Sequence, residues 1–255
     1  MRSFWIALSM YSKLPVPQVE WDKHALSWAL CWFLAVGIAA GGGLWLWFQL
    51  SALLRLGGPL FAAGALLVPI LVSGAIHLDG FCDTCDALSS HQSRERKLEI
   101  LKDSHTGAFA IICCCLYLLT FFAVWTEAGC TGRTGLVLAL GPVLSRSLSG
   151  LFAASLPNAR GSGLLATFTQ PMDAWKARAV LSLWAAACGA GMLLLDPAAG
   201  LGSLIGAGAV GLYYVVMSRR QFGGITGDLA GFFLQLCELA MVLGVVLAQK
   251  IGVLL

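Results

Sequence analysis

Long apolar runs dominate the chain, and short polar segments separate them. Between Lys23 and Arg55 the only titratable side chain besides cysteine is His24, so one long membrane-spanning helix is expected there. Six further apolar runs end at charged or turn-forming residues. The predicted spans are Ala25–Leu50, Pro59–Ile76, Gly107–Trp125, Thr134–Leu156, Ala179–Leu195, Ala198–Val216 and Leu229–Gln249. The expected fold class is an all-α, polytopic membrane helix bundle with about seven transmembrane helices.

Composition supports this assignment. Apolar residues make up 58% of the 255 positions and charged residues 11%, with a mean hydropathy of +0.83. A soluble domain has about 25% charged residues, so an aqueous globular fold is excluded. The net charge of +3 is too small to indicate a nucleic-acid partner. Six of the nine cysteines lie in apolar runs, where thiols act as small hydrophobic groups, so no disulfide framework is predicted.

Basic residues concentrate in alternate loops. Twelve lie on one side of the predicted spans: Arg2, Lys13, Lys23, Arg94, Arg96, Lys97, Lys102, Arg160, Lys176, Arg178, Arg219 and Arg220. Only Arg55, Arg133 and Lys250 lie on the other side. Loops rich in lysine and arginine stay in the cytoplasm, so the N-terminus is expected there. No internal repeat divides the sequence, and residues 1–255 are expected to form a single integral membrane domain.

Acidic residues gather in one predicted cytoplasmic segment, residues 77–103. Two triplets, each with its members on one face if the segment is helical, are Asp79, Asp83 and Asp86, then Glu95, Glu99 and Asp103. Like charges at this spacing destabilise a helix by about 0.2–0.5 kcal/mol per pair, and a bound cation would remove the repulsion. Oxygen-only ligands favour Mg²⁺, which completes its shell with water and phosphate. The pattern therefore predicts metal-assisted transfer at a phosphate or pyrophosphate.

Two other interpretations of this segment stay open. The acids could form a solvated loop with salt bridges to Arg94, Arg96 and Lys97. A zinc site would use Cys82-x2-Cys85 with His77 and His91, but one CxxC pair between aspartates is a weak signal.

A second polar group lies at the cytoplasmic start of the last span. Arg219 and Arg220 precede the sequence GGITGD, in which Thr226 can cap the next helix and Gly227 allows a close backbone approach to a ligand. A helix N-terminus with such neighbours is suited to phosphate binding. Candidate residues within or bordering the spans are Asp228, Arg146 and Glu238, since intramembrane charges are functional candidates. Both acidic blocks lie at one membrane face, so we expect their helices to converge.

Several blocks of the chain resemble one family. HLDGFCDTCDAL (77–88), RERKLEILKDSHTGAFA (94–110) and GGITGDLAGFFLQLCEL (223–239) look like the signature blocks of cobalamin synthase, the adenosylcobinamide-GDP ribazoletransferase family. MYSKLPVP (10–17) is similar to that family's opening. The resemblance extends from end to end, with the intervening spans matching only as hydrophobic segments.

The resemblance implies a Mg²⁺-dependent integral membrane transferase of the prokaryotic inner membrane, with its active site on the cytoplasmic face. Such an enzyme joins α-ribazole or its 5′-phosphate to adenosylcobinamide-GDP, forms adenosylcobalamin or its 5′-phosphate, and releases GMP. This is the last assembly stage of vitamin B12 biosynthesis. An oligomer is compatible with the sequence.

Residue roles also follow from the resemblance. The expected metal ligands are Asp79, Asp83 and Asp86, with Glu99 and Asp103. Lys102 would neutralise phosphate, Asp228 would be a further ligand or the base, and His77 matches a family position. The expected substrate-binding residues are Thr226, Gly227, Arg219, Arg220, Arg146 and Glu238.

Two rival functions share some of these features. A CDP-alcohol phosphatidyltransferase acting on phospholipids also carries aspartates on cytoplasmic helix ends, but Asp79-Gly80 lacks the Ala-Arg pair of that family's motif. A small cation transporter would use Arg146 and Glu238, but most of the acids lie outside the spans.

Overall fold

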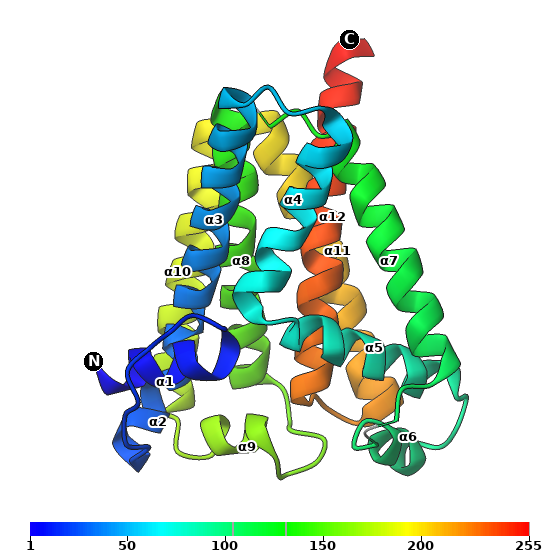
Figure 1. The fold of residues 1–255 in the computed structure, drawn as a ribbon. Helices are drawn as coiled ribbons and strands as arrows, with labels where there is room; N and C mark the ends of the chain where they lie inside the picture. Colours follow the sequence, from blue (N-terminus) through cyan, green and yellow to red (C-terminus); the bar gives the residue numbers. More distant parts are fainter. Residues whose placement is uncertain (104, 131, 255) are drawn as a thin grey trace.

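The computed structural model describes residues 1–103, 105–130 and 132–254, which form a helical bundle (Figure 1). The elements in chain order are α1 (Arg2–Tyr11), α2 (Lys23–Ala29), a 3₁₀ turn (Leu30–Trp32), α3 (Phe33–Leu53), α4 (Gly58–Ser73), α5 (Ile76–Ser89), α6 (Arg94–Ile100), α7 (Ala108–Glu127), α8 (Gly132–Ser155), α9 (Leu164–Thr169), α10 (Ala174–Leu195), α11 (Pro197–Phe222) and α12 (Gly227–Leu254). Ser104, within the block 94–110, lies outside the described residues.

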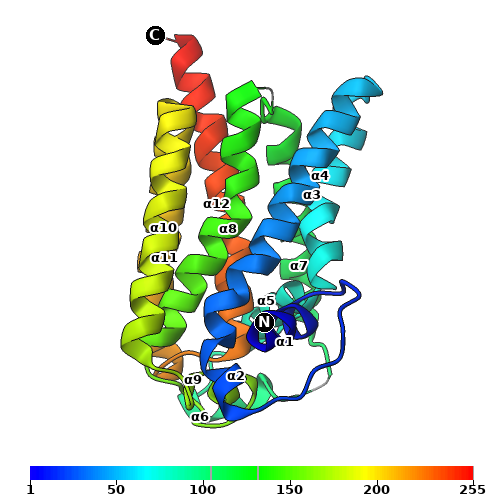
Figure 2. The ribbon, with the colours of Figure 1, turned by 90° about the vertical axis from the view of Figure 1, so that its left-hand side faces the viewer.

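Six of the described helical segments are long and apolar enough to cross a membrane: α2–α3 taken together, α7, α8, α10, α11 and α12. The bent pair α4–α5 raises the number to seven. The N-terminus lies near the end of the bundle that carries α6 and α9, and the C-terminus lies at the opposite end (Figures 1 and 2). The predicted all-α membrane bundle is therefore confirmed.

The second span departs from its prediction. Helix α4 ends at Ser73, the backbone of Gly74 and Ala75 is left-handed, and α5 begins at Ile76 turned by 94°. The 16 residues of α4 extend about 24 Å, less than the ~30 Å hydrocarbon core. A straight span over Pro59–Ile76 is thus wrong at its inner end. The turn directs the aspartate-bearing helix α5 across the bundle (Figure 1).

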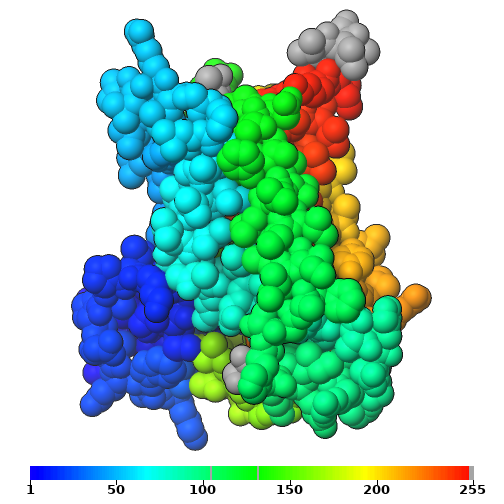
Figure 3. Space-filling model, turned by 45° about the vertical axis from the view of Figure 1, so that its right-hand side comes forward, coloured from blue at the N-terminus to red at the C-terminus, as the bar shows by residue number. Residues whose placement is uncertain are grey.

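Close packing holds the long helices together. Gly41 of α3 lies against the backbone of Ala139 in α8, with no room for a Cβ atom, so this glycine allows the two helices to pack closely. The first span changes from α-helical to 3₁₀ geometry before this point, at Leu30–Trp32 between α2 and α3. In the space-filling view α4 and α7 lie side by side on one face, with α6 at the end of α7 (Figure 3).

Candidate active site

Helices α5 and α12 cross in direct contact. A Cβ atom on Gly80 of α5 would lie 2.8 Å from the carbonyl oxygen and 2.9 Å from the Cα atom of Asp228. A Cβ atom on Gly231 of α12 would lie 2.8 Å from the carbonyl oxygen of His77. Two glycines therefore allow the helices to approach until their backbones touch. The two acidic blocks, which are far apart in the sequence, meet here as their shared membrane face predicts.

Asp79 and Asp83 of α5 lie close to this crossing. The segment is helical, as the i, i+4, i+7 spacing predicts, with Asp79 exposed and Asp83 half-buried. The carboxylate of Asp83 is close enough to those of Asp79, Asp86 and Asp228 for mutual repulsion, and Arg160 offsets part of it. Within the described ranges, no three His, Cys, Asp or Glu side chains already form a metal-binding group. A divalent cation would therefore have to draw these carboxylates together.

Asp86 has a partner of its own. Its two carboxylate oxygens accept hydrogen bonds from the backbone N–H groups of Gly107 at 2.7 Å and Ala110 at 3.1 Å. Gly107 is the N-cap residue of α7 and Ala110 lies in its first turn, where N–H groups lack helical partners. Asp86 thus caps α7 from a neighbouring helix and fixes α7 to α5.

The start of α12 has the geometry that its sequence predicts. The hydroxyl oxygen of Thr226 accepts a hydrogen bond from the backbone N–H of Leu229 at 3.3 Å, and its O–H donates to the Asp228 carboxylate at 3.3 Å. The predicted cap is therefore confirmed. The same threonine orients Asp228 at the mouth of the helix crossing.

Arg160 is a site residue that sequence reasoning missed. Its guanidinium forms an ion pair with the Asp228 carboxylate at 3.2 Å, and the two side chains are 15% and 26% exposed. Backbone hydrogen bonds hold its loop in place, from Ala159 N–H to the Ile225 carbonyl and from Ile225 N–H to the Pro157 carbonyl, both at 2.9 Å. The signal in the sequence is the polar, glycine-containing stretch after the fourth predicted span, from which the loop charge alone does not identify a site residue.

A cavity of about 150 Å³ opens beside these groups. Its polar lining comprises His77, Asp79, Ser149, Asn158, Arg160, Ser162, Thr226 and Asp228, together with the backbone of Gly227. Three buried nitrogen atoms of these residues lack a hydrogen-bond partner within the described part of the chain: Nε2 of His77, Nδ2 of Asn158 and Nε of Arg160. Buried polar atoms are normally paired, so this group indicates a site for a polar ligand.

The second acidic triplet does not reach the cavity. The Glu99 carboxylate pairs with Arg96 at 2.6 Å. Asp103 pairs with His105 at 2.7 Å, and hydrogen bonds from the His105 backbone and ring lower the pKa of Asp103 below its ordinary value. Helix α6 ends at Ile100, so Asp103 falls outside the predicted helical face. The structure therefore does not bring these acids to Asp79 and Asp83.

Three predicted basic residues also lie outside the cavity lining. Lys102 follows α6 and is exposed, and Arg219 and Arg220 are exposed in the last turn of α11. Their charges suit the C-terminal end of a helix, which favours cations.

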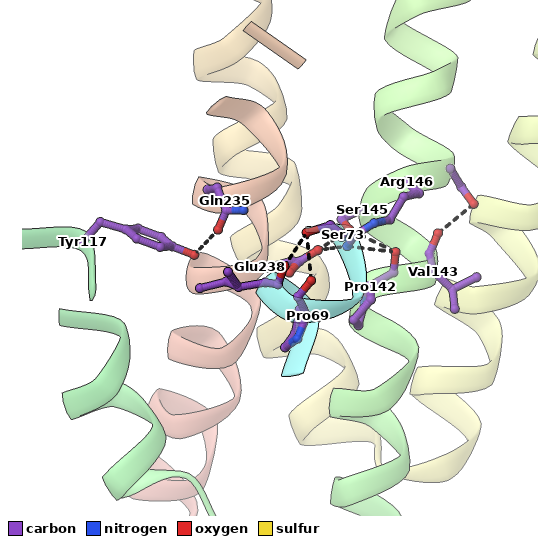
Figure 4. A network of polar contacts seen from close by, with 11 residues as sticks. Pro69, Ser73, Tyr117, Pro142, Val143, Ser145, Arg146, Gln235 and Glu238 are labelled. Atoms are coloured by element: carbon purple, nitrogen blue, oxygen red, sulfur yellow. Dashed lines mark hydrogen bonds and ion pairs between the residues drawn. The ribbon is translucent and has the colours of Figure 1, made fainter. Parts of the chain in front are cut away.

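Arg146 and Glu238, which are predicted to bind substrate, lie outside the lining of the cavity beside Asp228. They form an ion pair between α8 and α12, and both are almost fully buried in the bundle (Figure 4). Ser145 donates a hydrogen bond to Glu238 at 2.9 Å, and Tyr117 of α7 donates one to Gln235 of α12. Each charge therefore has a protein partner, which lowers its cost in a membrane. The pair also removes the main argument for a cation transporter.

The cysteines of α5 are packing residues. Cys82 and Cys85 face Cys114 and Cys113 of α7, and all nine thiols are free. No zinc-binding group of three ligands is present in residues 1–103, 105–130 and 132–254.

Comparison with known proteins agrees with this arrangement. The profile of the cobalamin-5-phosphate synthase family matches residues 3–246. The chain belongs to this family. Among family members named adenosylcobinamide-GDP ribazoletransferase, that of Lachnoclostridium phytofermentans is 43% identical over 251 residues, covering 98% of this chain and 95% of the relative. That of Pseudomonas fluorescens is 37% identical over 252 residues, covering 97% and 100%.

A third relative named adenosylcobinamide-GDP ribazoletransferase, from Desulfitobacterium hafniense, is 35% identical over 259 residues, covering 96% of each chain. No solved structure gives a significant match.

Proposed function

We propose that the chain is an adenosylcobinamide-GDP ribazoletransferase. It joins α-ribazole or its 5′-phosphate to adenosylcobinamide-GDP and releases GMP, the last assembly stage of vitamin B12 biosynthesis. The observation that carries this proposal is the meeting of Asp79 and Asp83 with Asp228 beside one cavity, in a chain matched by the family almost from end to end. The family match does not favour a CDP-alcohol phosphatidyltransferase.

We propose Mg²⁺ as the cofactor, held by Asp79 and Asp83. Their carboxylates supply only oxygen ligands, which suit a hard divalent ion that completes its shell with water and substrate phosphate. Bound Mg²⁺ would neutralise the pyrophosphate oxygens as charge develops on them. Repulsion among the acids around Asp83, offset in part by Arg160, supports a cation at this point. Asp86 is not among the proposed ligands, because its carboxylate already caps α7.

The reaction is a displacement at phosphorus. A ribose hydroxyl of the acceptor attacks the phosphorus on the corrinoid side of the pyrophosphate. A new O–P bond forms, the anhydride O–P bond breaks, and GMP leaves with the bridging oxygen. Asp228, which lines the cavity, accepts the hydroxyl proton. Arg160 turns from Asp228 towards the phosphate and donates hydrogen bonds to its oxygens, a role suited to a guanidinium.

The site is proposed to lie at the cytoplasmic face of the inner membrane, with the N-terminus also cytoplasmic. The twelve-to-three distribution of basic residues supports this orientation. A reporter inserted at Ser90 should be cytoplasmic, and one fused after Lys250 should face the other side. Both reporters on the same side would contradict the seven-pass arrangement.

A transfer assay tests the proposed activity. Purified protein in detergent with Mg²⁺ should release GMP from adenosylcobinamide-GDP only when α-ribazole is added, and EDTA should stop the release. GMP release without an acceptor, or none with both substrates and Mg²⁺ present, would contradict the proposal.

A further inference from the structure

The cavity beside Asp228 has a polar mouth and an apolar interior. The cavity opens where its lining is exposed, at Asp79, at Ser162 and Gly163 in the loop that follows Arg160, and at Gly227 at the start of α12. About one turn and two turns further along α12 lie Gly231 and Leu234, which line the same cavity. Leu234 is only 1% exposed, so this wall extends into the core of the bundle.

Residues from the N-terminal third of the chain complete the apolar wall. Leu30 and Phe33 line the cavity and are buried, and Leu165 of α9 joins them. The ring of Tyr11 lies 4.6 Å from that of Phe33, measured between centroids, and Phe33 meets the His77 ring edge-on at 5.7 Å. An aromatic and aliphatic pocket thus opens next to carboxylate, guanidinium and amide groups.

We propose that this cavity binds the nucleoside acceptor, with the benzimidazole base of α-ribazole in the apolar interior and the ribose at the polar mouth. This inference rests on the proposed function and states which of the two substrates occupies the enclosed space. It places an attacking ribose hydroxyl beside Asp228. The exposed Asp79, which lies closer to solvent, can then contact the pyrophosphate of the donor.

The chemistry of the lining selects this base over guanine. The methyl-bearing edge of dimethylbenzimidazole carries no hydrogen-bonding atom, so burial of this edge against Leu30, Phe33 and Leu234 leaves no polar group on it unpaired. Guanine carries amino, carbonyl and ring N–H groups along its edge, and these would lose their water partners against the same wall. A volume of about 150 Å³ accepts one bicyclic base, whereas a corrin ring is several times too large.

The unpaired buried nitrogens at this cavity fit the sugar. Nε2 of His77 and Nδ2 of Asn158 have no partner within the described part of the chain, and both residues line the cavity. Ribose hydroxyls both donate and accept hydrogen bonds, so they can pair with either nitrogen. A base alone would leave these atoms unsatisfied, and a nucleoside would not.

Equilibrium binding of α-ribazole to the full-length protein in detergent, with no corrinoid present, tests the inference. Ala153 of α8 lines the cavity, so Ala153→Leu should fill the base site. This variant should weaken α-ribazole binding by about tenfold or more, in line with a steric change in a hydrophobic pocket. GDP binding should be unaffected. Ala187→Leu, on an exposed face of α10, is the matched control and should leave both affinities unchanged.

Competition experiments on the unaltered protein keep the test decisive if Ala153→Leu fails to fold. A riboside lacking the two methyl groups should bind about tenfold more weakly than α-ribazole, and GDP should not displace α-ribazole. Displacement by GDP, or tighter binding of a guanine riboside, would assign the cavity to the donor and overturn the inference. If transfer activity is normal but folded Ala153→Leu binds α-ribazole normally, the inference fails while the proposed function stands.

Discussion

Replacing Arg160 by glutamine removes the cation that faces the acid cluster. The Arg160–Asp228 separation of 3.2 Å corresponds to about 5 kcal/mol of attraction at an effective dielectric constant of about 20. The net attraction between the two groups is smaller, because their side chains are 15% and 26% exposed to solvent and because both charges lose hydration on burial. If Arg160 moves to the phosphate during the reaction, it donates hydrogen bonds to oxygens whose negative charge grows in the transition state. Loss of one such donor costs about 2.7 kcal/mol of transition-state stabilisation. We therefore expect kcat/KM to fall about 100-fold.

The Mg²⁺ requirement separates this role from a structural one. Without Arg160 the carboxylates of Asp83 and Asp228 lose a competing positive charge, so half-saturation should need less Mg²⁺ even as turnover falls. GMP release is measured across a Mg²⁺ titration, with Arg178→Gln as a matched control because Arg178 is exposed at the start of α10. A near-parental kcat/KM, or an increased Mg²⁺ requirement, in correctly inserted Arg160→Gln protein would refute the reasoning.

Two further predictions concern the crossing of α5 and α12. Asp83→Asn should abolish GMP release at parental thermal stability, whereas Asp86→Asn should lose about 1 kcal/mol of stability because it weakens the cap on α7; equal melting temperatures for the two variants would contradict this division. Gly80→Ala should force α5 from the Asp228 backbone and lower kcat at least about tenfold, while Gly208→Ala, which has open space around its Cβ position, should leave kcat unchanged. Equal activities in the two glycine variants would show that the close approach is unimportant.

Much of this arrangement could be predicted from local sequence. Apolar runs indicate the spans, the spacing of Asp79, Asp83 and Asp86 indicates helix α5, and Thr226 indicates the cap of α12, because each depends on residues close in the chain. The left-handed turn at Gly74 and Ala75 was missed because Ala75 gives no local signal for such a backbone. The resulting 94° bend determines where the aspartates lie.

The structure adds most where interaction partners are distant in the sequence. Asp86 looked like its neighbours, but its oxygens meet a helix start in α7. Arg146 and Glu238 looked functional individually, and only the packing of α8 on α12 reveals that they neutralise each other. Arg160 was overlooked for the converse reason, since an arginine in a loop has no spacing that connects it with Asp228.

The rate of the chemical step in Asp228→Asn protein tests the central claim, that the two acidic blocks form one active site. Single-turnover GMP release from prebound adenosylcobinamide-GDP, started with a saturating concentration of α-ribazole, isolates this step from substrate binding. We predict a fall of at least about 100-fold, as expected for loss of a general base, with donor affinity largely retained. A near-normal rate in correctly inserted Asp228→Asn protein would contradict the account and leave the TGD block as the start of a helix only.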